Sequence, residues 1–312
     1  MSQILKINNS YVNEIISSLL PIKEIITDDT ITAGGFPLAV YLKVESTKDV
    51  FLPLLIKKLN ESYRSIEGIS YQDIDIWVKN NSSNGLLNSL LETEPISPLQ
   101  IGDYSIRISK KSNWANTFSI SCNLGFIYSK QIQIIKTRYQ NPEDLISKFD
   151  LNICKVAWCN GELFVSEDVM NDIHNCELSL NPKYDFGKEN FATRIYRSLR
   201  FIKYAKRYNL EPSKDICEYI FKVFLDSNHE HLKYDLKNDA NMIVINNYYK
   251  GSDKIYGMYQ SLISNETYEW FSKRKNFKKE WSLFLLNHPN ISIIQKIIDG
   301  EKNKNLFPEI IF

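Results

Sequence analysis

The sequence predicts an α+β protein with two domains. Residues 1–165 are expected to form a mixed sheet flanked by helices, and residues 166–312 an all-helical domain. Alternating apolar and polar residues, which are typical of strands, are concentrated in the first half of the chain. The second half shows mainly the apolar spacing of amphipathic helices, and the length of 312 residues also favours two domains over one.

Composition and charge exclude several classes of protein. Hydrophobic residues make up 43% of the chain, which is enough to bury a core, and the formal net charge is +1. Because this net charge is so small, any basic surface that attracts nucleic acid must be local. No apolar run approaches membrane-spanning length, and polar residues interrupt the apolar ones at the N-terminus. We therefore expect a soluble cytoplasmic protein with no membrane contact.

The cysteines predict neither a disulfide framework nor a structural zinc site, because their number is odd and no two of them form a CxxC pair. Buried free thiols in a reducing compartment fit better. The five positions are Cys122, Cys154, Cys159, Cys176 and Cys217.

A glycine pair separates the first predicted strand from a helix. Residues 30–32 have strand composition and lead into Gly34 and Gly35, and Pro37 suits the first turn of the helix that follows. Strand, glycine pair and helix N-terminus form a phosphate-binding arrangement, because backbone N–H groups can approach a ligand closely there. A plain tight turn has the same sequence.

Two carboxylates lie close together on the strand predicted over residues 71–78. Side chains in a strand alternate between its faces, so Asp73 and Asp75 point one way while Ile74 and Ile76 point the other. Two like charges on one face repel unless something neutralises them, and a divalent cation does so while also positioning phosphate oxygens. The alternative is an ordinary amphipathic strand with one solvated face.

The other elements follow from periodicity and capping residues. Asn141 and Pro142 are expected to start a short helix, and Gly161 marks a turn. Further strands are expected over residues 104–108, 117–122, 131–137 and 151–158, and further helices over 11–20, 48–63, 167–175, 188–208, 215–225, 254–262 and 266–286.

The helix over residues 188–208 carries one basic stripe and one apolar face. The stripe can neutralise phosphates, although a solvated helix face has the same pattern. Its members are Arg194, Arg197, Arg200, Lys203 and Arg207. The basic segment 273–279 has the same two interpretations. His229 and His231 are interpreted as a surface loop, and the dense aromatic residues of this half mostly as core, with a minority available to stack bases.

The order of these motifs resembles the DNA polymerase β nucleotidyltransferase superfamily. Gly34 and Gly35 match its glycine pair, and Asp73 and Asp75 match its DxD motif. The superfamily has a third acidic residue on a neighbouring strand, and Asp150 is the candidate for it. Phe36-Pro37 follow the glycines where the superfamily commonly has Ser or Arg.

A second resemblance lies further along the chain. The segment RIYRSLRF over residues 194–201 is similar to the helix that follows the catalytic head in bacterial poly(A) polymerases and CCA-adding enzymes. Together the two resemblances cover residues 28–210. The later template-reading motif of CCA-adding enzymes has no convincing copy here, so CCA specificity is not expected.

The resemblance implies an enzyme that moves a nucleoside monophosphate from an NTP or dNTP to a hydroxyl and releases pyrophosphate. Asp73, Asp75 and Asp150 would hold two Mg²⁺ ions, or Mn²⁺, as catalytic and metal-binding residues. The nucleotide and acceptor would contact Gly34, Gly35, Arg194, Arg197 and Arg200.

The acceptor stays open. The first hypothesis is the 3′ end of RNA or DNA, extended without a template. The others are a defence or signalling enzyme that makes an oligonucleotide messenger, and a toxin-like enzyme that modifies a protein. An inactive nucleotide-binding module is the non-enzymatic alternative. The sequence does not choose among ATP, CTP and the other nucleotides.

Overall fold

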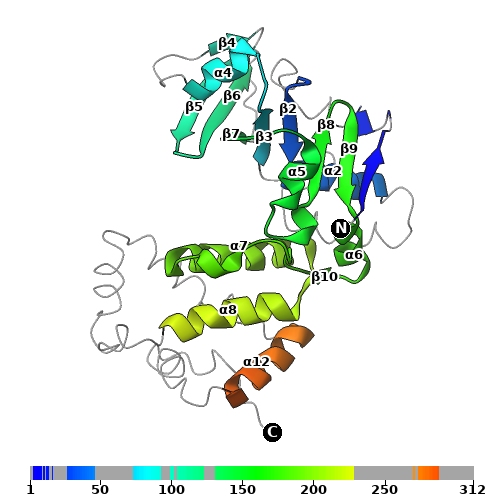
Figure 1. Cartoon of the computed structure of the whole chain (residues 1–312), viewed down its shortest axis with the longest axis vertical. Helices are drawn as coiled ribbons and strands as arrows, with labels where there is room; N and C mark the ends of the chain where they lie inside the picture. The colour runs from blue at the N-terminus through cyan, green and yellow to red at the C-terminus, as the bar shows by residue number, and fades with distance from the viewer. Residues whose placement is uncertain are drawn as a thin grey trace. The chain divides into compact units, whose positions relative to one another are not determined.

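The computed structural model describes residues 3–8, 10, 12–13, 16, 27–45, 73–92, 99–101, 104–122, 131–227, 270 and 273–287 (Figure 1). The chain divides into two compact units, Met1–His174 and Asn175–Phe312. The predicted α+β class is confirmed, because the first unit is built on a large sheet and the described part of the second is mainly helical. Whether the units coincide with the two functional domains expected from the sequence stays a prediction.

One nine-stranded sheet forms the first unit, in the order β1-β9-β8-β2-β3-β7-β6-β5-β4. The sheet is mixed, because β3 and β7 pair in parallel while the other neighbours are antiparallel. The strands are β1 Ile4–Ile7, β2 Thr30–Ala33, β3 Asp73–Lys79, β4 Leu99–Ile101, β5 Tyr104–Lys111, β6 Ala115–Cys122, β7 Gln131–Tyr139, β8 Val156–Cys159 and β9 Glu162–Ser166.

Capping residues set where the helices of this unit begin. The Asn141 side chain accepts a hydrogen bond from the Asp144 amide at the start of α5, and Pro142 is the first residue of that helix, as the sequence predicts. Asn84 Oδ1 accepts from the Leu87 amide in the same way at the start of α4. The helices are α2 Gly35–Glu45, α4 Gly85–Glu92, α5 Pro142–Ser147 and α6 Glu167–His174, with the 3-10 turn η2 Asn152–Cys154.

Strand β3 lies at the centre of the sheet and has two different faces. Ile74, Ile76 and Val78 are fully buried on one face. On the other face Trp77 packs in the core cluster that includes Leu145 of α5, and the two aspartates lie further along the same side. Helix α5 therefore covers one end of the aspartate face (Figure 1).

Several short elements differ from the sequence-based expectation. The strand expected over residues 151–158 is only β8, because residues 152–154 turn as η2. Strands β1, β4 and β9 and helix α4 have three to eight residues each and were not predicted, because so few residues give little periodicity. The helices expected over 48–63 and 254–262 lie outside the described residues, as do most of residues 11–20.

Helices α7, α8 and α12 build the described part of the second unit around aromatic side chains. Phe201, Phe221, Phe277 and Trp281 are all at most 5% exposed. The rings of Phe221 and Trp281 meet edge to face at 5.1 Å, which confirms the prediction that these aromatic residues are core. The elements are β10 Glu177–Leu178, η3 Phe186–Lys188, α7 Phe191–Tyr208, β11 Glu211–Pro212, α8 Lys214–Ser227 and α12 Lys275–Asn287.

The prediction of buried free thiols is confirmed for three described cysteines and wrong for a fourth. Cys154, Cys159 and Cys217 are buried free thiols, and Cys176 is an exposed one. Within the described residues, no helix combines the length and the apolar character that crossing a bilayer requires.

Candidate active site

Asp73 and Asp75 lie on the same face of β3 and are both half-buried, as the alternation predicts. The sheet register places Asp75 between Ala33 of β2 and Gln133 of β7. Gln133 Nε2 donates a hydrogen bond of 3.3 Å to Asp73 Oδ2. The carboxylate pair therefore has a neutral amide as its partner on the parallel neighbouring strand.

The glycine pair follows Ala33 directly, so the register brings it beside Asp75. Gly34 has a φ of +82°, a conformation that favours glycine. Its amide donates a hydrogen bond to the Val156 carbonyl of β8 at 2.9 Å. This bond contradicts the expectation that the Gly34 N–H donates to a phosphate. Gly35 is the first residue of α2, where helix amides have no partner within the helix.

Asp150 lies elsewhere in the first unit. It follows α5, is 4% exposed, and its Oδ1 accepts a 3.0 Å hydrogen bond from the Leu151 amide. Among the residues that the structure describes, no three His, Cys, Asp or Glu side chains are grouped to hold a metal ion. Asp150 thus does not complete a trio with Asp73 and Asp75, because it lies between α5 and β8 and not on either of the strands beside β3.

The donors at this site fit one cation better than two. Mg²⁺ in phosphate-transfer sites is bound through one or two carboxylates together with the phosphates of the substrate. Asp73 and Asp75 supply that number of carboxylates on one face of a central strand. A two-cation clamp needs further anionic ligands, and Gln133 at the adjoining position carries no charge.

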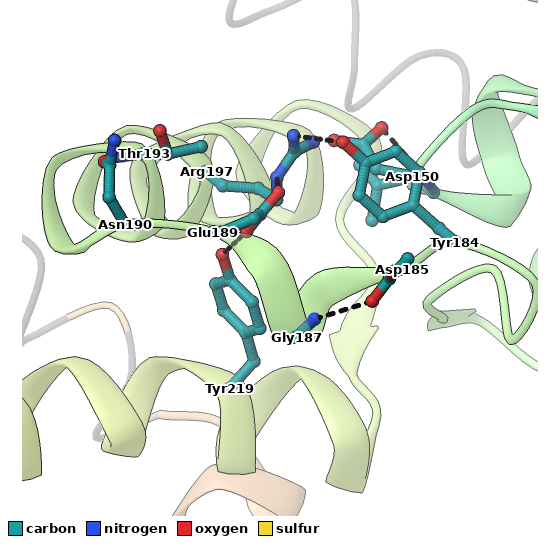
Figure 2. Close-up of polar contacts among 10 residues, drawn as sticks. Asp150, Tyr184, Asp185, Gly187, Glu189, Asn190, Thr193, Arg197 and Tyr219 are labelled. Carbon is teal, nitrogen blue, oxygen red and sulfur yellow. Dashed lines mark hydrogen bonds and ion pairs between the residues drawn. The ribbon is translucent and has the colours of Figure 1, made fainter.

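Arg197 of α7 takes part in an internal network of the second unit. Its Nε lies 2.6 Å from Glu189 Oε1, its Nη2 donates to the Tyr184 hydroxyl at 2.6 Å, and its guanidinium lies 4.6 Å from the centre of the Tyr184 ring. Figure 2 shows Glu189 between Arg197 and Tyr219, whose hydroxyl also donates to Glu189. Burial, and then the hydrogen bond to Glu189, raises the pKa of Tyr219 above its ordinary value.

The basic stripe of α7 is therefore not a uniform solvated face. Arg207 is 3% exposed, and the guanidinium of Arg200 lies 4.7 Å from the centre of the Tyr204 ring. Arg194 is half-buried, whereas Lys203 is exposed. Helical spacing correctly placed these side chains on one helix, but it could not find Glu189 and Tyr184, which come from the segment before the helix.

The basic segment over residues 273–279 likewise contains both a side chain with internal contacts and exposed side chains. Arg274 lies 4.5 Å from the centre of the Trp270 ring, donates to Asn209 Oδ1 at 3.0 Å and pairs with Glu211 at 3.5 Å. It thereby holds the end of α7. The exposed members are Lys273, Lys275, Lys278 and Lys279.

Fold and site together define a class: α+β proteins whose mixed sheet presents an acidic pair beside a helix that begins at a glycine. The chain belongs to the Gabija anti-defense 2 family, whose model matches residues 6–176, more than half of the chain. Among solved structures, the complex of a CCA-adding enzyme with ATP is similar, with 13% sequence identity and a TM-score of 0.38, covering 98% of this chain and 71% of that one. No curated protein matches.

Proposed function

We propose that the first unit binds a nucleoside triphosphate through a divalent cation at Asp73 and Asp75 and transfers its nucleotidyl group to a hydroxyl. The first acceptor to consider is a nucleic-acid 3′ end. The observation that supports this most is the same-face carboxylate pair, which the register sets beside the start of α2. The family name adds the biological setting, in which the transfer would act against a defence system.

Each residue has a defined part in this proposal. Asp73 and Asp75 would hold the cation, and the Gly35 amide at the start of α2 would donate to a phosphate oxygen. A Mg²⁺ ion, when bound, supplies charge that stabilises the phosphates and the departing pyrophosphate. The acceptor oxygen forms a bond to the α-phosphorus, the bond from that phosphorus to the bridging oxygen breaks, and the hydroxyl proton passes to a carboxylate or to water.

A second candidate is a nucleotide-binding module without turnover. Gln133 favours it, because the position beside Asp75 on the parallel strand carries an amide and the described residues offer no third carboxylate there. Such a module would bind the nucleotide and act on a protein of the defence system by contact.

The deciding experiment follows each labelled ribo- and deoxynucleotide in the presence of Mg²⁺ or Mn²⁺, with and without RNA or DNA. We expect the label to move to the nucleic acid with the wild-type protein, and to stay on the nucleotide with the Asp73→Asn and Asp75→Asn double variant. Asp144→Asn is the control, because it removes a carboxylate from the exposed side of α5 in the same unit.

The distribution of the label separates the alternatives. Label on a protein supports protein modification, and small soluble products support messenger synthesis. Nucleotide binding that needs Asp73 and Asp75 but gives no transfer supports the inactive module. Transfer that persists in the double variant, or the absence of nucleotide binding by the wild type, contradicts the proposal.

A further inference from the structure

The aspartate face of the sheet continues as a polar surface across β7, β6 and β5. Residues paired across neighbouring strands share a face, so the register extends from Asp75 to Gln133, then to Thr117, then to Lys110. Ser119 and Arg107 pair with one another two residues further along the same face. Of these side chains, Arg107, Lys110 and Ser119 are exposed.

The apolar side chains of these strands point to the opposite face. Phe118, Ile120 and Ile132 are at most 2% exposed there. The Asn116 amide on that side donates to the carbonyls of Leu90 and Leu91 at the end of α4, both at 3.0 Å. Helix α4 thus covers the apolar face, and the polar face carries no buried apolar side chain between Gln133 and Lys110.

The charge of this region has one sign. The segments 104–122 and 131–139 contain no acidic residue, although the whole chain has a net charge of only +1. Arg107 and Lys110 lie on the polar face, whereas Lys111 pairs with Asn116 on the other face and Arg138 donates to Asn88 of α4 at 3.0 Å. The two cations are therefore presented on the same side as the aspartates.

An exposed aromatic side chain stands at the turn between β5 and β6. Trp114 is 59% exposed, the largest value among the exposed large hydrophobic residues of the described chain. Two hydrogen bonds hold the backbone of this turn. The Trp114 carbonyl accepts from the Lys136 amide at 2.9 Å, and the Ser112 hydroxyl donates to the Ala115 carbonyl at 2.8 Å. Because Trp114 stands opposite Lys136 and alternates with Ala115, it lies on the side of Asn116 and is not part of the polar face.

We infer that this polar face, defined by Arg107, Lys110 and Ser119, binds single-stranded nucleic acid and leads it towards the carboxylate pair. Arg107 and Lys110 contact the phosphates of the strand. Three strand spacings separate Lys110 from Asp75, about 14 Å, which a short oligonucleotide spans. The inference rests on the proposed function for its role, since it names the class of acceptor.

The test measures the binding of a short labelled single-stranded RNA or DNA by fluorescence anisotropy over a range of salt concentrations, without nucleotide or divalent cation. Each phosphate contact on a single strand contributes about 0.7 to the slope of log K against log salt, so Arg107→Ala with Lys110→Ala should reduce the slope by about 1.4. Trp114→Ala should leave binding within about twofold of the wild type, because this turn residue lies outside the polar face.

Lys110→Ala and Lys111→Ala form a matched pair, because the two residues are neighbours with the same charge and are both exposed, but lie on opposite faces. Only Lys110→Ala should weaken binding, whereas Lys111→Ala should stay within about twofold of the wild type. Equal losses in the two variants, or no binding by the wild type, would overturn the inference. So would competition by polyglutamate as strong as that by an oligonucleotide of equal charge, since the surface would then suit an acidic protein.

Failure of this inference is distinguishable from failure of the proposed function. The Asp73→Asn and Asp75→Asn double variant should bind the oligonucleotide at least as tightly as the wild type, because two negative charges are removed beside its path. If nucleotide binding depends on the aspartates but oligonucleotide binding does not depend on Arg107 and Lys110, only the inference about the polar face is contradicted. If the oligonucleotide binds as described while no nucleotide does, only the proposed transfer is lost.

Discussion

Glu189 is a nearly buried carboxylate that two donors hold in place. Its side chain is 7% exposed, and Arg197 and Tyr219 both contact it. A buried carboxylate needs such partners, because its charge loses the solvation that water provides. The sequence predicted Arg197 as a nucleotide-binding residue, and that stays a prediction; the contacts to Glu189 and Tyr184 give the side chain a structural role within the second unit.

Replacing Arg197 by alanine tests that role. The change leaves the Glu189 charge without its counterion, and breaking a buried pair in this way costs about 3 kcal/mol or more of stability. We expect Arg197→Ala to lower the urea concentration at the midpoint of unfolding accordingly, at an unchanged slope. Lys203→Ala, on the exposed side of the same helix, is the control and should change stability by less than about 0.5 kcal/mol. An unchanged midpoint for Arg197→Ala would show that its pair with Glu189 does not stabilise the unit.

At the scale of elements, the turn from β2 into α2 depends on the backbone of Gly34. Its φ of +82° lies in the left-handed region, while a side chain added there would meet no atom within 4 Å. Gly34→Ala should therefore cost only the backbone strain, about 1–2 kcal/mol. Gly85, which begins α4, also has open space around it but no such φ, so Gly85→Ala should be neutral or slightly stabilising.

Urea unfolding of the two variants measures this difference directly, since both add one methyl group to the N-terminal end of a helix in the same unit. Equal stabilities would mean that the bend at Gly34 does not need glycine. A loss well above the backbone cost would mean that the added methyl disturbs the carboxylate pair next to the bend.

Local signals explain which elements the sequence could predict. Strand β3 alternates strictly, α5 has Asn141 and Pro142 at its start, and α7 has a long amphipathic period, so each is defined by residues close together in the chain. The prediction that Asp150 is the third acidic residue of the site failed, because the place of such a residue depends on which strand pairs with β3. The register that sets Gln133 beside Asp75 joins strands separated by more than fifty residues, and no short motif encodes such a pairing.

At the scale of the whole molecule, the family match and the candidate site both fall in the first unit. The family model covers residues 6–176, and the first unit spans Met1–His174. The carboxylate pair, the glycine turn and the polar face that binds nucleic acid in our inference all belong to this unit. A ligand that binds the carboxylate pair should consequently stabilise the folded state of the first unit.

Thermal unfolding with Mn²⁺ and a non-hydrolysable nucleoside triphosphate tests this linkage. A ligand that binds only the folded state at a hundred times its dissociation constant stabilises it by about 2.7 kcal/mol. For a unit of this size, that raises the unfolding temperature by about 5–10 °C. The Asp73→Asn and Asp75→Asn double variant should show no such shift, and without ligand it should be at least as stable as the wild type, because two like charges no longer face each other.

Gln133→Glu provides the complementary variant, because it adds a carboxylate at the place where the sheet sets an amide beside Asp75. Without ligand, three like charges on one face should make it less stable than the wild type. With Mn²⁺ alone it should gain more stability than the wild type does, since a third anionic ligand tightens cation binding. Gln131→Glu is its control, because this residue pairs with Asp73 but is exposed. Equal responses to Mn²⁺ in the two glutamate variants would show that the added charge matters but its position at residue 133 does not. The carboxylate pair would then not be a defined cation site.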